Sequence, residues 1–68
     1  MPIINVKMTH EDGGATKEQK EELAKKLTDA FVEVFNRGEK TCIESIDEVS
    51  TDNYAIGGKT ITNIRKGN

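Results

Sequence analysis

Pro2 is the residue of this sequence with the clearest potential for acid–base chemistry. It follows Met1, and an initiator methionine is readily removed before a residue as small as proline. Removal leaves a secondary amine at the start of a strand, and a free α-amino group has a reference pKa of about 7.7–8.0. Because desolvation or a nearby cation lowers the pKa of an amine, we expect a neutral base near physiological pH. The alternative is that Pro2 is only a tolerated residue at a strand start.

Cys42 and His10 are the other residues with chemical potential, and each is the only one of its type. A single cysteine cannot form an internal disulfide, and one cysteine with one histidine cannot fill a four-ligand zinc site, so we expect no metal. Nothing near Cys42 in the sequence supplies a cation that would lower its pKa, which favours a small buried residue over a nucleophile. We expect His10 to be a solvated residue of a loop.

The composition is that of an ordinary soluble surface. The 68 residues carry 10 basic and 12 acidic side chains, interleaved along the chain, for a net charge of −2. Without a clustered cationic field, we expect no nucleic-acid partner and no membrane partner. The longest apolar runs, Ile3–Ile4 and Ala30–Val32, are far shorter than the roughly 20 residues that span a bilayer. We therefore expect one domain, residues 1–68, in the cytoplasm.

Three elements are expected to position these residues. Residues 2–8 alternate as a half-buried strand, with Ile4, Val6 and Met8 on one face, and residues 41–49 form a second, more polar strand. Between them, Thr16 and Gln19 fit a capping box that begins a helix. The helix has one apolar stripe and ends near residues 36–38, with Gly38 in the left-handed conformation. The stripe comprises Leu23, Leu27, Ala30, Phe31, Val34 and Phe35.

These elements predict a βαβ unit of the α+β (α/β) class. A helix of about 20 residues spans about 30 Å, which returns the chain to the start of the first strand, so the two strands run parallel. Residues 50–53 form a turn, residues 56–61 form a small hairpin around Gly57–Gly58, and residues 63–68 fray. Because a two-stranded parallel sheet leaves one face and both edges uncovered, we expect other copies of the chain to cover them.

Four segments in this order resemble the 4-oxalocrotonate tautomerase superfamily: residues 1–7 (MPIINVK), 16–20 (TKEQK), 46–49 (IDEV) and 53–58 (NYAIGG). The Gly13–Gly14 loop before the helix is similar to that of the short bacterial and archaeal members. The resemblance implies a homohexamer without a cofactor. It also implies keto–enol tautomerisation with the N-terminal proline as acid and base.

The same resemblance places Pro2 on the catalytic proline and Tyr54 on the aromatic residue of the substrate pocket. The two family arginines, which bind substrate carboxylates and polarise the carbonyl oxygen, fall on Ala15 and Ile43 and are absent. Another cation is then expected to replace them. The candidates are Arg37, Lys40, Lys7, Lys59, or Arg65 from a neighbouring subunit, and we take Tyr54, Lys40 and Arg37 as the predicted substrate-binding residues.

The leading hypothesis is a cofactor-free tautomerase, an isomerase acting on the enol and keto forms of small 2-oxo acids. One alternative is a hydratase or dehalogenase on the same scaffold, in which Pro2 is the acid and Glu44 positions water. Against that role, Glu44 could simply lie on a strand face that is partly exposed at a subunit boundary. The other alternative is a catalytically idle oligomeric binding protein, which the two missing arginines favour.

Overall fold

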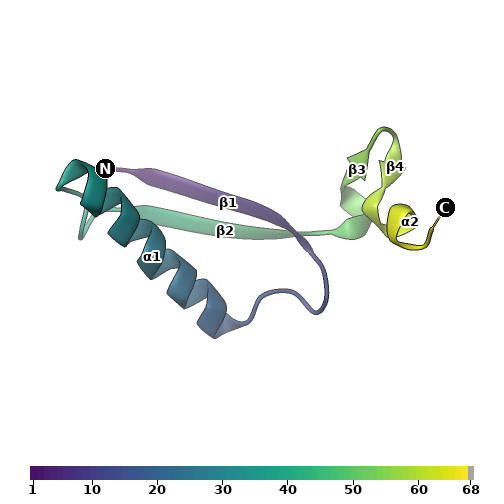
Figure 1. Cartoon of the computed structure of the whole chain (residues 1–68), viewed down its shortest axis with the longest axis horizontal. Coiled ribbons are helices and arrows are strands. Elements are labelled where there is room, and N and C mark those ends of the chain that lie inside the picture. The colour runs from purple at the N-terminus through teal and green to yellow at the C-terminus, as the bar shows by residue number, and fades with distance from the viewer. Residues whose placement is uncertain (68) are drawn as a thin grey trace.

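The computed structural model describes residues 1–67, which form a βαβ unit followed by a small C-terminal subdomain (Figure 1). The elements are β1 (Ile3–His10), α1 (Lys17–Phe35), β2 (Ile43–Ser50), the 3₁₀ turn η1 (Thr51–Asn53), β3 (Ala55–Ile56), β4 (Lys59–Thr60) and α2 (Ile61–Arg65). The N-terminus and the end of α1 lie at one end of the sheet, and the subdomain lies at the other (Figure 1).

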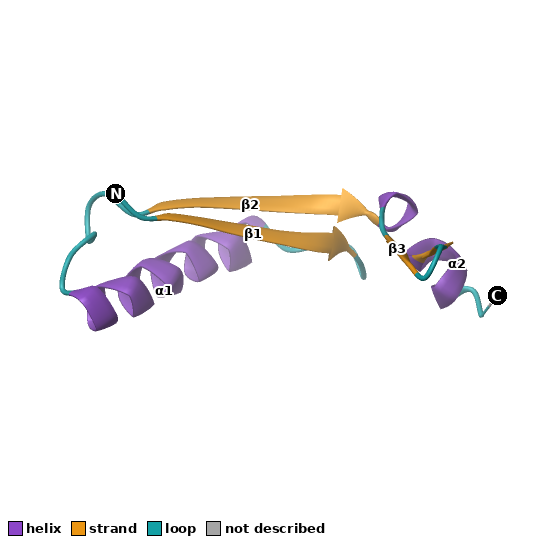
Figure 2. Cartoon of the chain, turned by 90° about the horizontal axis from the view of Figure 1, so that it is seen from above, coloured by secondary structure: helices purple, strands orange, loops and turns teal. Residues whose placement is uncertain are grey.

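The two long strands run parallel, as the length of the helix predicts. Their register runs from Ile3 opposite Ile43 to His10 opposite Ser50. α1 lies along one face of this sheet, so the opposite face is bare in the protomer (Figure 2). The predicted bounds were wrong by one or two residues at each end, since β1 runs from Ile3 to His10 and β2 from Ile43 to Ser50. His10 therefore ends a strand and does not lie in a loop.

The capping box that begins α1 is confirmed. The Thr16 hydroxyl accepts from the Gln19 backbone N–H at 3.0 Å, and the Gln19 side chain accepts from the Thr16 N–H at 2.9 Å. The end of the helix differs from the prediction, because Asn36 takes the left-handed conformation at φ 56°. Asparagine tolerates this conformation, and its N–H donates to the Val32 carbonyl at 2.8 Å. Gly38 has φ +93° in the turn that follows.

The apolar stripe of α1 is only partly the predicted one. Leu23, Leu27 and Phe31 are half-buried, but Ala30, Val34 and Phe35 are exposed. The half-buried face is completed by Lys20, Ala24, Thr28 and Val32. A sheet of two strands is too narrow to cover a wide stripe, so the outer apolar residues have no partner within the protomer.

The C-terminal subdomain confirms the hairpin and corrects the expected frayed tail. β3 and β4 pair antiparallel around Gly57 and Gly58. Residues 61–65, however, form α2, which begins where the Thr60 hydroxyl accepts from the Asn63 N–H at 3.3 Å. The helix is tied to the loop before α1 by Arg65. The last residue, Asn68, lies outside the described residues.

The protomer lacks a closed core. Within residues 1–67 no hydrophobic side chain is fully buried, and Ile3 on the bare sheet face is 74% exposed. The accessible surface is 5227 Å², against about 4,200 Å² for a compact monomer of this mass. The radius of gyration is 15.5 Å, against about 11 Å for a compact domain of this length. The fold therefore leaves apolar surface exposed in the protomer.

Neither helix in the described part of the chain is long and apolar enough to cross a membrane.

Candidate active site

Pro2 lies half-buried at the start of the sheet, where two contacts fix its position. Its carbonyl accepts from the Ile43 backbone N–H at 2.9 Å, which joins it to β2. Its ring packs on Gly38, because a Cβ placed on that glycine would lie 3.2 Å from Pro2 Cγ and 3.0 Å from the Phe31 ring. Met1 is 78% exposed. The preceding peptide bond is thus at the surface, while the proline ring is held by its neighbours.

The turn after α1 closes around Pro2 and brings two predicted site residues to this end of the molecule. The Gly38 carbonyl accepts from the N–H groups of Thr41 and Cys42, at 3.2 and 2.9 Å, which forms the turn that carries Lys40. Arg37 precedes Gly38, and its guanidinium carbon lies 5.8 and 5.7 Å from the ring centroids of Phe31 and Phe35. Both cations are exposed.

Tyr54 lies at the opposite end of the protomer. It follows η1, beyond the carboxyl end of β2, and its side chain is 44% exposed. The strands between Pro2 and Tyr54 are 8 residues long, which corresponds to about 25 Å. One protomer therefore does not bring these two predicted residues together.

The two positions where the family arginines were expected also lie apart. Ala15 is in the loop before α1, where its N–H donates to Glu48 at 3.1 Å. Ile43 adjoins Pro2, with its side chain on the face away from α1 and 39% exposed. Neither side chain can supply a positive charge.

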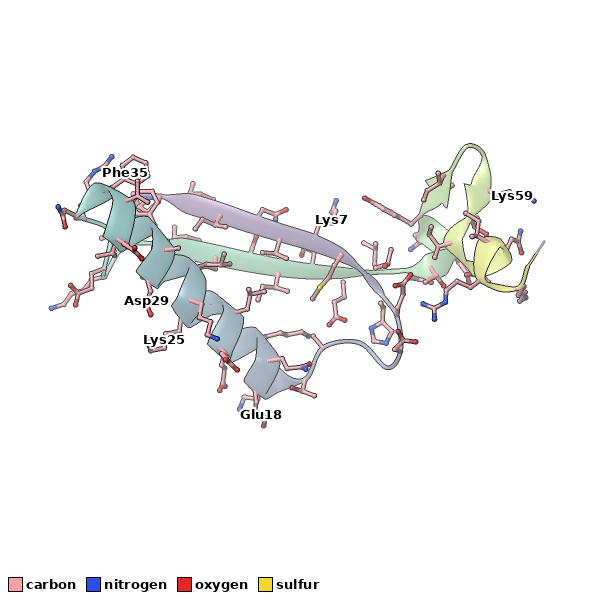
Figure 3. All side chains as sticks on the ribbon, in the orientation of Figure 1. Lys7, Glu18, Lys25, Asp29, Phe35 and Lys59 are labelled. Atoms are coloured by element: carbon pink, nitrogen blue, oxygen red, sulfur yellow. The ribbon has the colours of Figure 1, made fainter. Side chains whose placement is uncertain are left out.

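The remaining candidate cations are dispersed in the protomer. Arg65 is engaged by Asp12 at 3.1 Å and Glu11 at 3.4 Å. Lys7 points away from α1 on the bare face of β1, and Lys59 lies on the hairpin (Figure 3). Of the candidate cations, Arg37 and Lys40 therefore lie at the same end of the protomer as Pro2 (Figure 1).

Glu44 faces α1 and is half-buried, with its carboxylate bonded to the Thr28 hydroxyl. It does not lie on an outward face at a subunit boundary. The hydrogen bond from Thr28, and a second from Cys42, lower the pKa of Glu44. The same contact with Glu44, together with partial burial, raises the pKa of the Cys42 thiol. Cys42 is therefore no activated nucleophile, and Glu44 is a carboxylate engaged in the interface between helix and sheet.

Glu48 forms a second polar cluster at the other end of the sheet. It accepts from Lys20 Nζ at 2.7 Å and lies 3.3 Å from His10 Nδ1, and its side chain is 13% exposed. The hydrogen bond from Lys20 and that from the Ala15 N–H lower the pKa of Glu48. His10 is 54% exposed, so it is solvated as expected but has a carboxylate partner.

A shallow hollow of about 380 Å³ adjoins this cluster. It is lined by Met8, Thr9, Glu11, Asp12, Gly14, Ala15, Gln19 and Glu48. This region was not predicted as a site from the sequence. The alternation of β2 contained the signal, since it places Glu48 on the same inward face as Ile46.

The comparisons with known proteins agree with this architecture. The family model described as "Tautomerase enzyme" matches residues 2–64. A probable tautomerase of Helicobacter pylori strain J99 is 41% identical over 68 residues, with all of both chains covered. The 2-hydroxymuconate tautomerase of Bacillus subtilis is 36% identical over 64 residues, covering 94% of this chain and 98% of the relative.

Solved structures show the same fold. The crystal structure of DmpI from Helicobacter pylori has a TM-score of 0.86 at 39% identity, covering 98% of this chain and 100% of that chain. A heterohexamer 4-oxalocrotonate tautomerase from Chloroflexus aurantiacus has a TM-score of 0.80 at 28% identity, covering 96% of this chain and 100% of that chain. The chain therefore belongs to the tautomerase family, within the 4-oxalocrotonate tautomerase superfamily.

Proposed function

We propose that this protein is a cofactor-free tautomerase that interconverts the enol and keto forms of small 2-oxo acids, with the nitrogen of Pro2 as general base and acid. Membership of the tautomerase family supports the reaction class. The role of Pro2 rests on its setting, because its ring packs on Gly38 and its carbonyl is held by β2. A base fixed by its neighbours can be aligned with the reacting atoms of a substrate.

The chemistry needs the secondary amine that removal of Met1 leaves. The lone pair of the neutral amine accepts the enol hydroxyl proton, and the O–H bonding pair stays on oxygen as an enolate. The resulting prolyl ammonium then delivers its proton to the carbon of the former double bond that does not carry the oxygen, as the carbonyl forms. A cation or a backbone N–H stabilises the negative charge that develops on oxygen between the two transfers. The proton count is unchanged at the end, as an isomerase requires.

We further propose that the active form is a homohexamer and that its sites are completed between subunits. The bare sheet face, the absence of a closed core within residues 1–67 and the distance between Pro2 and Tyr54 support this arrangement. The heterohexamer from Chloroflexus aurantiacus is a related fold with six chains. Tyr54 of one subunit would then form an apolar wall near Pro2 of another.

The test is turnover of phenylenolpyruvate by the processed chain and by Pro2→Ala, whose terminal nitrogen becomes a primary amine and is still basic. We expect activity in both, lower in the variant, and a rate that rises with pH as the amine loses its proton. No turnover by the processed wild-type chain would favour the idle binding protein. Turnover that is insensitive to the Pro2→Ala substitution and to pH would exclude Pro2 as the base.

A further inference from the structure

Arg37, just after the end of α1, contacts the rings of two phenylalanines. The rings of Phe31 and Phe35 lie 4.6 Å apart between centroids, tilted by 34°, and the guanidinium carbon lies less than 6 Å from both centroids. Such cation–π contacts hold the guanidinium by its faces and leave the N–H groups at its edge free to donate. Within residues 1–67, no carboxylate lies within 4.0 Å of Arg37.

Phe31, one of the two rings that contact Arg37, also lies next to the turn that contacts Pro2. Gly38 directly follows Arg37, and the point where its Cβ would lie is 3.0 Å from the Phe31 ring and 3.2 Å from Pro2 Cγ. Phe31 therefore borders both the cation and the turn that supports the proline. Figure 3 places Phe35 at the same end of the molecule, above the last turn of α1 and beside the start of β1. The turn that contacts Pro2 is thus bordered by the aromatic ring that also contacts the Arg37 guanidinium.

The other cation at this end lacks such support. Lys40 is exposed in the turn after Gly38, and no aromatic ring of residues 1–67 stacks against it. A lysine on a free stem has more rotamer freedom to lose on binding than a guanidinium that is already stacked. The geometry therefore favours Arg37 as the anion-binding group.

We propose that Arg37 is the specificity-determining residue of the Pro2 site, which binds the carboxylate of a 2-oxo monocarboxylic acid. Its planar edge can donate two parallel hydrogen bonds to one carboxylate. One cation stacked on Phe31 and Phe35 at the Pro2 end of the protomer matches a substrate with one carboxylate and an apolar tail. This inference rests on the proposed function of Pro2, and it adds the substrate class.

The experiment compares Arg37→Ala with wild type on phenylenolpyruvate and on its uncharged methyl ester. We expect kcat/KM for the acid to fall on the order of 10- to 100-fold, chiefly through KM, because a hydrogen-bonded charge pair is lost. Turnover of the ester should change by less than about twofold. Arg37→Lys should recover part of the loss. Lys25→Ala removes one equally exposed positive charge from α1 and should leave both substrates unaffected.

A second readout is equilibrium binding of phenylpyruvate by calorimetry, which needs no turnover. Binding that requires Arg37 in a protein without tautomerase activity would support this inference and overturn the proposed reaction. Turnover that depends on Pro2 but not on Arg37 would overturn the inference alone. Equal losses on the acid and the ester, or the loss of acid specificity in Lys40→Ala and not in Arg37→Ala, would also overturn it.

Discussion

At the scale of single residues, Glu48 connects more of the protomer than any other ionisable side chain of residues 1–67. Its carboxylate receives Lys20 from α1 and the Ala15 N–H from the preceding loop, and it lies beside His10 of β1. Gly14 packs against the same carboxylate, since an added Cβ would lie 2.7 Å from Glu48 Oε2. The Glu48 carboxylate thus links the end of β1, the loop before α1 and the first turns of α1.

We expect Glu48→Gln to lower the urea midpoint of unfolding at pH 7. Because the pKa of Glu48 is lowered in the folded protein, its stabilising contribution is complete above the ordinary pKa of a glutamate. The contribution is lost as the pH falls through the lowered folded pKa, so the difference between wild type and variant should shrink as the pH falls. Glu21→Gln is the control, since the pair with Lys17 at 3.9 Å is exposed. A difference in midpoint that does not change with pH would contradict this role.

Gly38 is the residue against which the Pro2 ring packs. We expect Gly38→Ala to destabilise the protein by about 1–3 kcal/mol, because φ is +93° and the new methyl group would meet Phe31 and Pro2. Gly57→Ala is the matched control, with φ +60° and no atom within 4 Å of the added group. Thermal unfolding should show the larger loss for Gly38→Ala, with reduced tautomerase activity. Equal losses for the two variants would mean that the contact with Pro2 is unimportant.

At the scale of elements, local sequence signals predicted where a helix begins better than they predicted which of its side chains pack against the sheet. Thr16 and Gln19 sufficed to locate the first residue of α1, because a capping box is complete within four residues. The faces were harder to predict: Val34 and Phe35 fit a helical stripe, but a two-stranded sheet contacts only part of it. The short α2 was missed because it is held by Arg65 against the distant Asp12.

The cap of α1 can be tested separately from its packing. We expect Thr16→Ala to cost about 1 kcal/mol, since the hydroxyl that accepts from the Gln19 N–H is lost at an exposed position. Thr16→Ser keeps the hydroxyl and should remain within a few tenths of a kcal/mol of wild type. Urea unfolding at one protein concentration measures both variants. Equal stability of the alanine and serine variants would show that the cap is not needed.

At the scale of the whole molecule, the sequence indicated candidate site residues but not their arrangement. Pro2 was proposed from its type and position, and Arg37 was one of several candidate cations. The sequence could not place Arg37 on two rings, because that contact depends on how the last turn of α1 meets the start of β1. Nor did it separate Tyr54 from Pro2, which lie about 25 Å apart in one protomer, because the resemblance assigned both residues to a single pocket.

We expect the protein to sediment as a hexamer of the 7.5 kDa chain at micromolar concentration. Ile3→Glu puts a charge on the bare sheet face and should produce smaller species with weaker thermal stability. Glu22→Gln, on the outward face of α1, should leave the assembly intact. A monomer that stays folded, for wild type or for Ile3→Glu, would contradict the need for covering subunits.

The central claim is that the free nitrogen of Pro2 transfers the proton. The most direct measurement is the turnover of phenylenolpyruvate by two preparations verified by intact mass, one from which Met1 has been removed and one in which an N-terminal extension blocks Pro2. An amide nitrogen has no basic lone pair, so only the processed chain should be active, while both should form the same oligomer. Equal turnover by the extended chain would contradict the account and show that another group is the base.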